Sequence, residues 1–544
     1  MLKSEGKDQQ TRTRTMTITG STQLGLANAF QRVKVAGARN RHRTRARARA
    51  GLFALSLTAA CVTACSDSPT GVDPDPVPPG DTAAPALLRE MRGLWIATVA
   101  NIDWPSRSNL SAVEQQAELI DILTRAAGAG INTVIFHVRP AGDAVYSSSI
   151  EPWGAMLTGT QGHDPGYDPL AFAIQEAHAR GMELHAWVNP FRAGNTADTA
   201  RLAPSHLFYT RRDLIRVYAG NIWMDPGEPD VHDHSMRVIS DIVRRYDIDA
   251  IHADDYFYPY VVNDAQGRPI AFPDSATYTR YSAGSSLGDW RRANVDRFIE
   301  RMYREVHAVK PTLKVGISPF GIWRPGNPPG VQGLDAYASI YADSRKWLQQ
   351  GWVDYLAPQL YWSIAAPQQS FPALLDWWLA QNTMNRHVWP GLAAYRVNDG
   401  TASAFTLQEI PNQITTTRAR SAGTGHILYN TNTTLKRNNG ALANTLAQDI
   451  YLTRVVVPAT PWLDAVPPGA PTLTFASGAI QITPATGEPA RWWVICSHRN
   501  SGWTSRVVFA TDRALIIDAT VDRVLVQAAD QVMNLSTVAE WRRG

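Results

Sequence analysis

Between residues 92 and 452, eight short runs rich in β-branched and aromatic residues alternate with segments of helical periodicity. This regular alternation favours parallel strands joined by helical crossovers. The predicted strands are Gly93–Val99, Ile131–Arg139, Glu183–Val188, Ile248–Ala253, Lys314–Ser318, Val353–Gln359, Val388–Ala394 and His426–Asn430. The predicted helices are Ala112–Ala127, Pro169–Arg180, His232–Tyr246, Trp290–Val309, Ala342–Gln350, Phe371–Ala380, Leu407–Arg420 and Ala441–Tyr451.

Eight strand–helix units predict an α/β fold, the (β/α)8 TIM barrel, which takes roughly 200 to more than 400 residues. A doubly wound open sheet is the alternative, but its phosphate-binding fingerprint G-x-G-x-x-G is absent. Long insertions follow the second, third and fourth strands, at about residues 140–167, 189–231 and 254–289. Because active sites of barrels lie at the carboxyl ends of the strands, we expect a deep cleft there.

We place the barrel at residues 89–455 and a proline-marked linker at 456–471. Short β-type runs then predict a small fibronectin III-like β-sandwich over residues 472–544. Its predicted runs are Phe475–Ile482, Arg491–Cys496, Arg506–Ala510, Leu515–Ile517 and Val524–Ala528. Cys496 has no partner in this segment, and we expect a buried, inert thiol.

The first 64 residues hold 12 of the 52 lysines and arginines but only 2 of the 48 acidic residues. Six arginines from Arg39 to Arg49 precede the uncharged run Gly51–Ala64, whose fourteen residues are too few to span a bilayer. This arrangement is typical of a secretory signal peptide, which we place at residues 1–64. Val62-Thr63-Ala64-Cys65 resembles a bacterial lipobox, which predicts lipidation of Cys65 and an extended, proline-rich tether over residues 65–88. A plain signal peptide and a later start at Met16 are the alternatives.

After this leader, 40 basic residues stand against 46 acidic ones, so nucleic-acid binding is not expected. No cysteine–histidine spacing of the zinc type is present, and we expect neither a metal nor a cofactor. Serine-triad, phosphate-loop and H-E-x-x-H motifs are also absent, which gives protease, NTPase and metallohydrolase functions no support. The sequence predicts no particular oligomeric state.

Asp254 and Asp255 follow the fourth predicted strand, where barrel enzymes carry catalytic groups. Two carboxylates this close cannot both ionise freely, so one can hold a proton near neutral pH. A proton donor beside a carboxylate suits glycoside hydrolysis. An acidic pair in a solvated loop is the alternative. For Asp247 and Asp249, which precede the strand core, we expect only that they cap or solvate a turn.

Polar and aromatic residues also end the other predicted strands, a combination that suits sugars, which present apolar faces edged by hydroxyl groups. We expect His137, His185 and His252 to lie in the barrel interior or behind the contact residues, not to bind a metal. His232 and His234 are predicted to stand at the start of a helix.

Several motifs, in order along residues 89–455, resemble those of the glycosyl-hydrolase-like family 10 lipoproteins, the DUF187 group. They are Met91–Thr98, His137–Asp143, Trp153 with Pro165–Leu170, Asn189–Arg192, Asp225–Gly227, Asp254–Pro259 and Gln359–Trp362. Strand ends and motifs together predict these glycan-contact residues: Trp95, His137, Arg139, Asp143, Asn189, Arg192, Asp225, Tyr256, Tyr258, Trp323, Gln359 and Trp362.

The resemblance implies a TIM-barrel glycoside hydrolase of the bacterial envelope, acting on peptidoglycan strands that lack stem peptides. With the lipobox, it places the protein on a lipid anchor at the outer membrane, facing the periplasm. A non-catalytic glycan-binding lipoprotein and a hydrolase of another polysaccharide are the alternatives.

No second acidic residue stands clearly at the end of the sixth strand, where many retaining barrel enzymes place one. On a 2-acetamido sugar, the substrate's own carbonyl oxygen can serve as nucleophile. By similarity to O-GlcNAc hydrolases, Asp254 would orient the acetamido N–H and Asp255 would protonate the leaving oxygen, with the reverse order left open. By similarity to chitinase-like barrels, Tyr361 would hydrogen-bond the acetamido oxygen.

Overall fold

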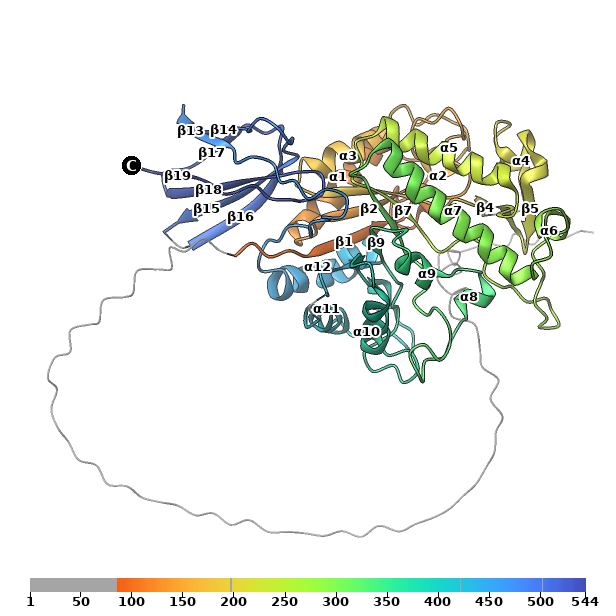
Figure 1. Ribbon diagram of the computed structural model, residues 1–544. Helices are drawn as coiled ribbons and strands as arrows, with labels where there is room; N and C mark the ends of the chain where they lie inside the picture. The colour runs from red at the N-terminus through yellow and green to blue at the C-terminus, as the bar shows by residue number, and fades with distance from the viewer. Residues whose placement is uncertain (1–85, 196–197, 421, 501) are drawn as a thin grey trace, which may run out of the picture. The chain divides into compact units, whose positions relative to one another are not determined.

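A closed barrel of parallel strands forms the centre of the computed structural model, which describes residues 86–195, 198–420, 422–500 and 502–544 (Figure 1). β1 pairs in parallel with β2 on one side and β12 on the other. β10 and β11 are two halves of one strand interrupted at Pro390: β10 pairs with β9 and β11 with β12, so the barrel closes. The strands are β1 (Met91–Ile96), β2 (Thr133–Arg139), β3 (Glu183–Val188), β7 (Ala250–Ala253), β8 (Lys314–Ile317), β9 (Tyr355–Leu356), β10 (His387–Val388), β11 (Gly391–Leu392) and β12 (Gly425–Leu428). The predicted TIM barrel is confirmed.

A helix follows each barrel strand and packs on the outside of the barrel (Figure 1). Local sequence sets where the helices begin: Ser111 and Glu114 form a capping box on α1, and Asp168 caps α3, which starts at Pro169. These helices are α1 (Ala112–Gly128), α3 (Pro169–His178), α5 (Pro229–Arg245), α7 (Leu287–Val309), α9 (Ser344–Gln349), α10 (Phe371–Gln381), α11 (Glu409–Arg418) and α12 (Ala441–Thr445). The predicted last helix continues beyond α12 as a π-helix over Leu446–Ile450. No described helix combines the length and apolarity needed to cross a bilayer.

The long insertions follow β2, β3 and β7 as predicted, and a fourth lies between β8 and α9. The insertion after β3 folds into a small antiparallel sheet that the sequence did not predict, with β6 in the middle. The inserted elements are α2 (Ala155–Thr158), β4 (Arg192–Gly194), α4 (Leu207–Thr210), β5 (Ile215–Tyr218), β6 (Asn221–Met224), α6 (Ser275–Tyr281) and α8 (Ala336–Ser339).

Aromatic rings and buried polar groups fill the barrel together. Trp95, Trp187, Tyr355 and Trp389 are all less than 5% exposed and belong to one apolar cluster. The histidines at positions 137, 185 and 252 are fully buried. The prediction that they lie in the interior is therefore confirmed.

Residues after the barrel form two antiparallel sheets that pack around one apolar cluster, which confirms the predicted β-sandwich. The predicted run Phe475–Ile482 is wrong as one strand, because a turn with positive φ at Ser477 and Gly478 divides it. Cys496 is only partly buried, and burial raises the pKa of its thiol. The sheets consist of β13 (Thr472–Ala476), β14 (Ala479–Thr483) and β17 (Ala514–Ile516), and of β16 (Gly502–Phe509), β15 (Trp492–Arg499), β18 (Val521–Ala529) and β19 (Ala539–Arg542).

Arg491, just before β15, contacts the amino end of barrel strand β7. Its guanidinium donates to Asp249 Oδ1 at 2.7 Å, and Gln531 donates to the same oxygen at 3.3 Å. The expectation that Asp249 caps or solvates a turn is wrong, since this carboxylate is fully buried and ion-paired.

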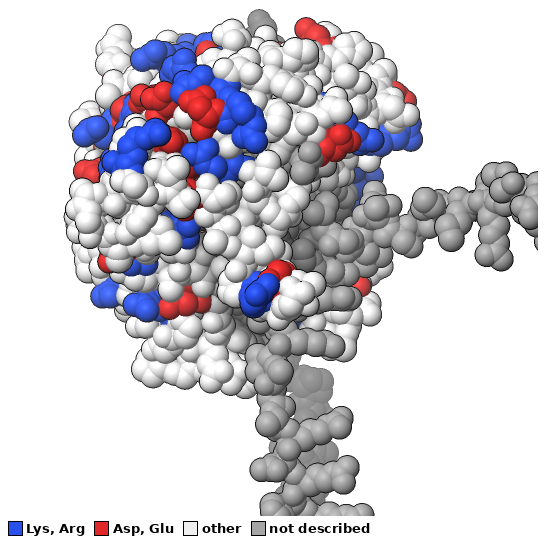
Figure 2. Space-filling view, turned by 90° about the vertical axis from the view of Figure 1, so that its right-hand side faces the viewer, with Lys and Arg blue, Asp and Glu red and all other residues white. Residues whose placement is uncertain are grey.

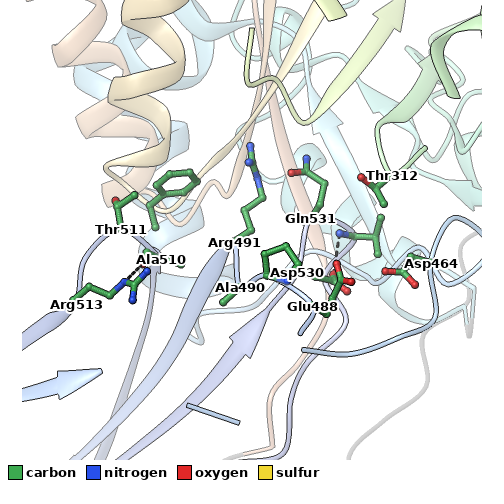
Figure 3. A pocket seen from close by; sticks show the side chains of 13 residues that line it. Thr312, Asp464, Glu488, Ala490, Arg491, Ala510, Thr511, Arg513, Asp530 and Gln531 are labelled. Atoms are coloured by element: carbon green, nitrogen blue, oxygen red, sulfur yellow. Dashed lines mark hydrogen bonds between the residues drawn. The ribbon is translucent and has the colours of Figure 1, made fainter. Parts of the chain in front are cut away.

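A cavity of about 410 Å³ lies beside this contact, and Figure 3 shows Arg491 and Gln531 together at its wall. Thr312, from the loop before β8, also lines it. This cavity is therefore at the amino end of the barrel, opposite the end where the sequence predicts the deep cleft.

Candidate active site

Asp254 and Asp255 stand directly after β7, at the carboxyl end of the barrel. Asp254 Oδ1 accepts the backbone N–H of Asp255 at 2.9 Å and the side-chain amide of Gln359 at 3.1 Å, and lies 3.4 Å from Ser318 Oγ. The Tyr260 hydroxyl donates to Asp255 Oδ2. Groups that follow β7, β8 and β9 therefore fix both carboxyls on the rigid rim of the barrel.

The two carboxyls have no ion pair with a lysine, arginine or histidine of the described chain. Burial, and then the charge of Asp255, raises the pKa of Asp254 well above its usual range. Burial also raises the pKa of Asp255, but the Tyr260 hydrogen bond acts in the opposite direction. Asp254 is 9% exposed and Asp255 only 1%. The proton therefore favours Asp254, the more accessible carboxyl.

A cation and a group of aromatic rings lie near the pair. The Arg192 guanidinium carbon is 4.5 Å from the centre of the Tyr256 ring, and its buried Nε has no hydrogen-bond partner in the described structure. Tyr361 stacks on Tyr429 with ring centres 6.1 Å apart. The charge of Asp254 raises the pKa of both tyrosines further, after the larger effect of their burial. These side chains offer flat surfaces and polar edges suited to a sugar.

Three of the predicted glycan-contact residues are buried in the barrel interior. His137 stacks on Trp187 with ring centres 3.7 Å apart, and its Nε2 is 3.2 Å from the Asn189 amide nitrogen. Trp95 Nε1 lies 3.4 Å from His252 Nε2. Because His137, Asn189 and Trp95 are at most 2% exposed, they support the rim rather than form its surface.

Residues 90–406 match the family described as Glycosyl hydrolase-like 10. The chain belongs to this family. It is 37% identical over 480 residues to Glycosyl hydrolase YngK of Bacillus subtilis (strain 168), covering 83% of this chain and 93% of that protein. It is 36% identical over 370 residues to Glycosyl hydrolase DigH of Escherichia coli (strain K12), covering 63% of this chain and 83% of that protein. Family membership supports a glycosidase-like role.

Two solved structures align with about two thirds of this chain. The PgaB (BpsB) glycoside hydrolase domain from Bordetella bronchiseptica aligns with 66% of this chain and 99% of its own, at 13% identity and a TM-score of 0.44. The catalytic domain of β-amylase from Paenibacillus polymyxa aligns with 67% of this chain and 99% of its own, at 13% identity and a TM-score of 0.42. Neither bears on the roles of individual residues in this member of the glycosyl hydrolase-like 10 family.

Three predicted contact residues belong to separate buried networks. Arg139 pairs with Glu151 at 2.5 Å. Beside them, burial and then the charge of Glu151 raise the pKa of Asp143 to about 6. Asp225 is fully buried and pairs with Arg216 at 2.8 Å. The structure does not bring these groups to the Asp254 rim, and their contact with a glycan stays a prediction.

Tyr258, Trp323 and Trp362 differ in their surroundings. Tyr258 is 1% exposed, and its hydroxyl accepts from the Asn294 amide at 3.4 Å. Trp323 stacks on Trp377 with ring centres 5.9 Å apart. Trp362 packs on Phe320, which in turn contacts Tyr260, the donor to Asp255.

The sequence analysis did not select Ser318, Tyr260 or Tyr429 as site residues. Ser318 and Tyr429 stand at or near the ends of predicted strands, so the strand-end rule applied to every strand would have found them. Tyr260 lies just past the acidic motif, and only the fold of that loop directs its hydroxyl to Asp255.

Among the described residues, no group of three or more histidine, cysteine, aspartate or glutamate side chains is arranged to hold a metal ion. Figure 2 shows basic and acidic residues intermixed on the visible face, with broad uncharged areas between them. The visible face therefore carries no extended field of one sign.

Proposed function

We propose that this protein is a glycoside hydrolase of N-acetylated glycan strands, with Asp254 as the proton donor. One observation carries the proposal: two neighbouring carboxyls end strand β7 without an ion pair, and the more exposed one has the strongly raised pKa. A carboxyl that stays protonated at neutral pH can protonate a leaving glycosidic oxygen.

In the proposed first step, the Asp254 proton passes to the glycosidic oxygen as its bond to the anomeric carbon breaks. The substrate's acetamido oxygen forms the new bond to that carbon, while ionised Asp255 accepts the acetamido N–H. Tyr361 hydrogen-bonds the acetamido oxygen. Water then opens the ring intermediate and returns a proton to Asp254. This order of roles reverses the one first expected, because Tyr260 stabilises the charge on Asp255.

The side chain of Arg192 favours a glycan substrate that carries carboxylates. It is the cation whose charge acts on Asp254, and it holds no carboxylate partner in the described structure. In peptidoglycan, the lactyl group of N-acetylmuramic acid exposes such a carboxylate once the stem peptide is removed. We therefore propose peptidoglycan strands without stem peptides as the substrate.

Digestion of purified sacculi, with and without prior amidase treatment, tests the substrate. We expect new reducing ends only after amidase treatment, and defined GlcNAc–MurNAc oligomers then give the cleaved bond by product mass. Binding without new reducing ends would establish the non-catalytic alternative. Cleavage of an exopolysaccharide but not of sacculi would establish a different substrate.

Aryl N-acetylglucosaminides test the two roles. A dinitrophenyl group leaves without acid assistance, so the Asp254→Asn variant should retain turnover of this substrate while losing turnover of oligosaccharides. The Asp255→Asn variant should lose both, because the nucleophilic acetamido group is no longer held. The opposite pattern would make Asp255 the proton donor and Asp254 the residue that orients the acetamido group.

We also propose that Cys65 carries a lipid that holds the enzyme at the outer membrane, facing the periplasm. The wild-type chain should fractionate with outer membranes and show a lipid-modified Cys65 by mass spectrometry. The Cys65→Ser variant should lose both properties. A soluble wild-type protein cleaved elsewhere would favour a plain signal peptide.

A further inference from the structure

A continuous row of buried polar side chains crosses the barrel interior from its amino end to Asp254. Every member before Asp254 is at most 2% exposed. The row has two halves, which meet at the hydroxyl of Tyr355. Its members, in order, are Lys314, Glu183, His185, Tyr355, His252, Ser318 and Asp254.

The lower half fixes the direction of its hydrogen bonds. Lys314 Nζ donates to Glu183 Oε1 at 2.9 Å. Burial alone would raise the pKa of Glu183, but Lys314 lowers it, so this group is a carboxylate and can only accept. Its other oxygen lies 3.0 Å from His185 Nε2, which must carry the proton. His185 Nδ1 is then a bare acceptor, and the Tyr355 hydroxyl, 2.8 Å away, donates to it.

The upper half must follow the same direction. The Tyr355 hydroxyl has one proton, already committed, so its oxygen accepts from His252 Nδ1 at 2.9 Å. His252 Nε2 is then bare and accepts from Ser318 Oγ at 2.9 Å. Trp95 gives an independent check, because its indole N–H can only donate and points to the same Nε2 at 3.4 Å. This longer contact from outside the row agrees with the tautomer that the Tyr355 hydroxyl imposes on His252.

The Ser318 proton is thus directed to His252 and away from Asp254 Oδ1, which lies 3.4 Å from Ser318 Oγ. A donated hydrogen bond from Ser318 would stabilise the ionised carboxylate. We propose that Tyr355 and His252 are positioning residues: they withhold the Ser318 hydrogen bond from Asp254 and so keep Asp254 in its acid form. This inference rests on the proposed role of Asp254 as proton donor.

Packing inside the barrel fixes the position of the Tyr355 ring. Its ring lies against Gly316 of the neighbouring strand, where a Cβ would stand 1.9 Å from the ring. It also packs on Trp389 with ring centres 4.9 Å apart. A glycine is therefore required beside Tyr355, and the ring, which is fully buried, is held where its hydroxyl reaches both histidines.

Other groups that face Asp254 act on its charge directly. Asp255 disfavours ionisation of Asp254, whereas Arg192 favours it. Gln359 donates to the same oxygen, and Tyr361 and Tyr429 face it from the ends of β9 and β12. The hydrogen bonds and ring contacts of Tyr355 are with His185, His252 and Trp389, so the Tyr355→Phe change is not made at any of these groups.

The Tyr355→Phe variant tests the proposal. Without the hydroxyl, His252 can give up the longer Trp95 contact, carry its proton on Nε2 and donate to Ser318, whose own proton then turns to Asp254. The alkaline limb of the kcat/KM profile should move to lower pH by about half to one unit, because one gained hydrogen bond favours the carboxylate. KM at acid pH should not change. A limb that stays in place or moves to higher pH would overturn the proposal.

A double variant and a matched control separate this effect from general damage to the fold. The Tyr355→Phe/Ser318→Ala protein cannot make the new hydrogen bond, so its alkaline limb should return to the wild-type position. The Tyr451→Phe variant also removes a buried tyrosine hydroxyl that contacts a histidine, His426, but it lies outside the row and should leave the limb unchanged. A double variant that keeps the shift would contradict the proposal.

The histidine tautomers can be measured without any substrate. In protein labelled with ¹⁵N-histidine, we expect the proton of His185 on Nε2 and that of His252 on Nδ1. Finding the same tautomer at both positions would refute the inference even if the protein is active. The expected tautomers together with no glycosidase activity would instead refute the proposed function.

Discussion

The two ends of strand β7 carry aspartates with opposite electrostatics. Asp249, before the strand, is fully buried, and its oxygens accept from Arg491 at 2.7 Å and from His178 at 2.9 Å. Burial alone would raise its pKa, but Arg491 and His178 hold it well below the usual range. Asp254, after the strand, is similarly buried but lacks an ion pair, and its pKa is raised. The partner, not burial alone, decides in which direction the pKa of a buried carboxyl moves.

The largest expected effect is on activity at the carboxyl end. The Asp254→Asn variant keeps the shape and the acceptor oxygen but has no proton to give, so turnover of glycan strands should fall about 100- to 10,000-fold. Reducing-end assays on the variant and the wild type measure this loss. Wild-type turnover in the variant would remove Asp254 from the mechanism.

The same variant should gain stability in alkaline solution. Because folding raises the pKa of Asp254, its favourable contribution is present below the unfolded pKa of about 3.9 and is lost as pH rises through the folded pKa. The neutral asparagine has no such loss. Thermal melts at increasing pH should therefore show the variant becoming more stable than the wild type.

The identical change at the amino end should affect folding and not chemistry. In the Asp249→Asn variant Arg491 loses a buried partner, so the free energy of unfolding should fall by about 3–5 kcal/mol. Denaturant titration measures this change. Turnover per folded molecule should match the wild type, and a specific loss of turnover would show that the two ends of β7 are coupled.

The pH dependence of this loss has the opposite sign to that of Asp254. Since folding lowers the pKa of Asp249, its contribution is present above the unfolded pKa of about 3.9 and is lost as pH falls through the folded pKa. The stability difference between the wild type and Asp249→Asn should therefore shrink in acid. A difference independent of pH would mean that the carboxylate charge is not what stabilises this contact.

A smaller effect is expected from Tyr260, the donor to Asp255. The Tyr260→Phe variant removes the hydrogen bond that favours ionised Asp255. The pKa of Asp255 should rise, so the acidic limb of the kcat/KM profile should move to higher pH by about one unit. If the acidic limb does not move, a group other than Asp255 determines it.

The smallest expected effect concerns Asp247, which shares Arg491 with Asp249 but is 59% exposed at its side chain. An exposed ion pair contributes little, so the Asp247→Ala variant should lose less than about 1 kcal/mol of unfolding free energy. Denaturant titration beside Asp249→Asn gives the comparison directly. Equal losses at the two positions would show that burial is not the deciding factor.

Sequence periodicity predicted the barrel because each strand and helix carries its own local signal. Strands such as β2 and β3 are short runs that are buried along their whole length, and Ser111 and Glu114 form the capping box of α1. The sheet of β4, β5 and β6 was missed, since short strands inside an insertion depend on pairing with each other rather than on a local pattern.

The candidate site was predicted in part, for a related reason. Asp254 and Gln359 end predicted strands and do meet, at 3.1 Å. Asp225 belongs to an equally recognisable motif, yet it pairs with Arg216 in a buried network. A motif indicates that a side chain has a specific role, but only its three-dimensional neighbours show whether that role is chemical or structural.

The sequence by itself determined the barrel, the sandwich after it, and the acidic pair at the end of β7, because hydrophobic periodicity and strand order are local properties. The tertiary structure alone decided which aspartate pairs with Arg491 and which has a raised pKa. It also brought together the buried polar side chains from Lys314 to Ser318. Electrostatic energy depends on distances between residues far apart in the chain, and only the folded barrel fixes those distances.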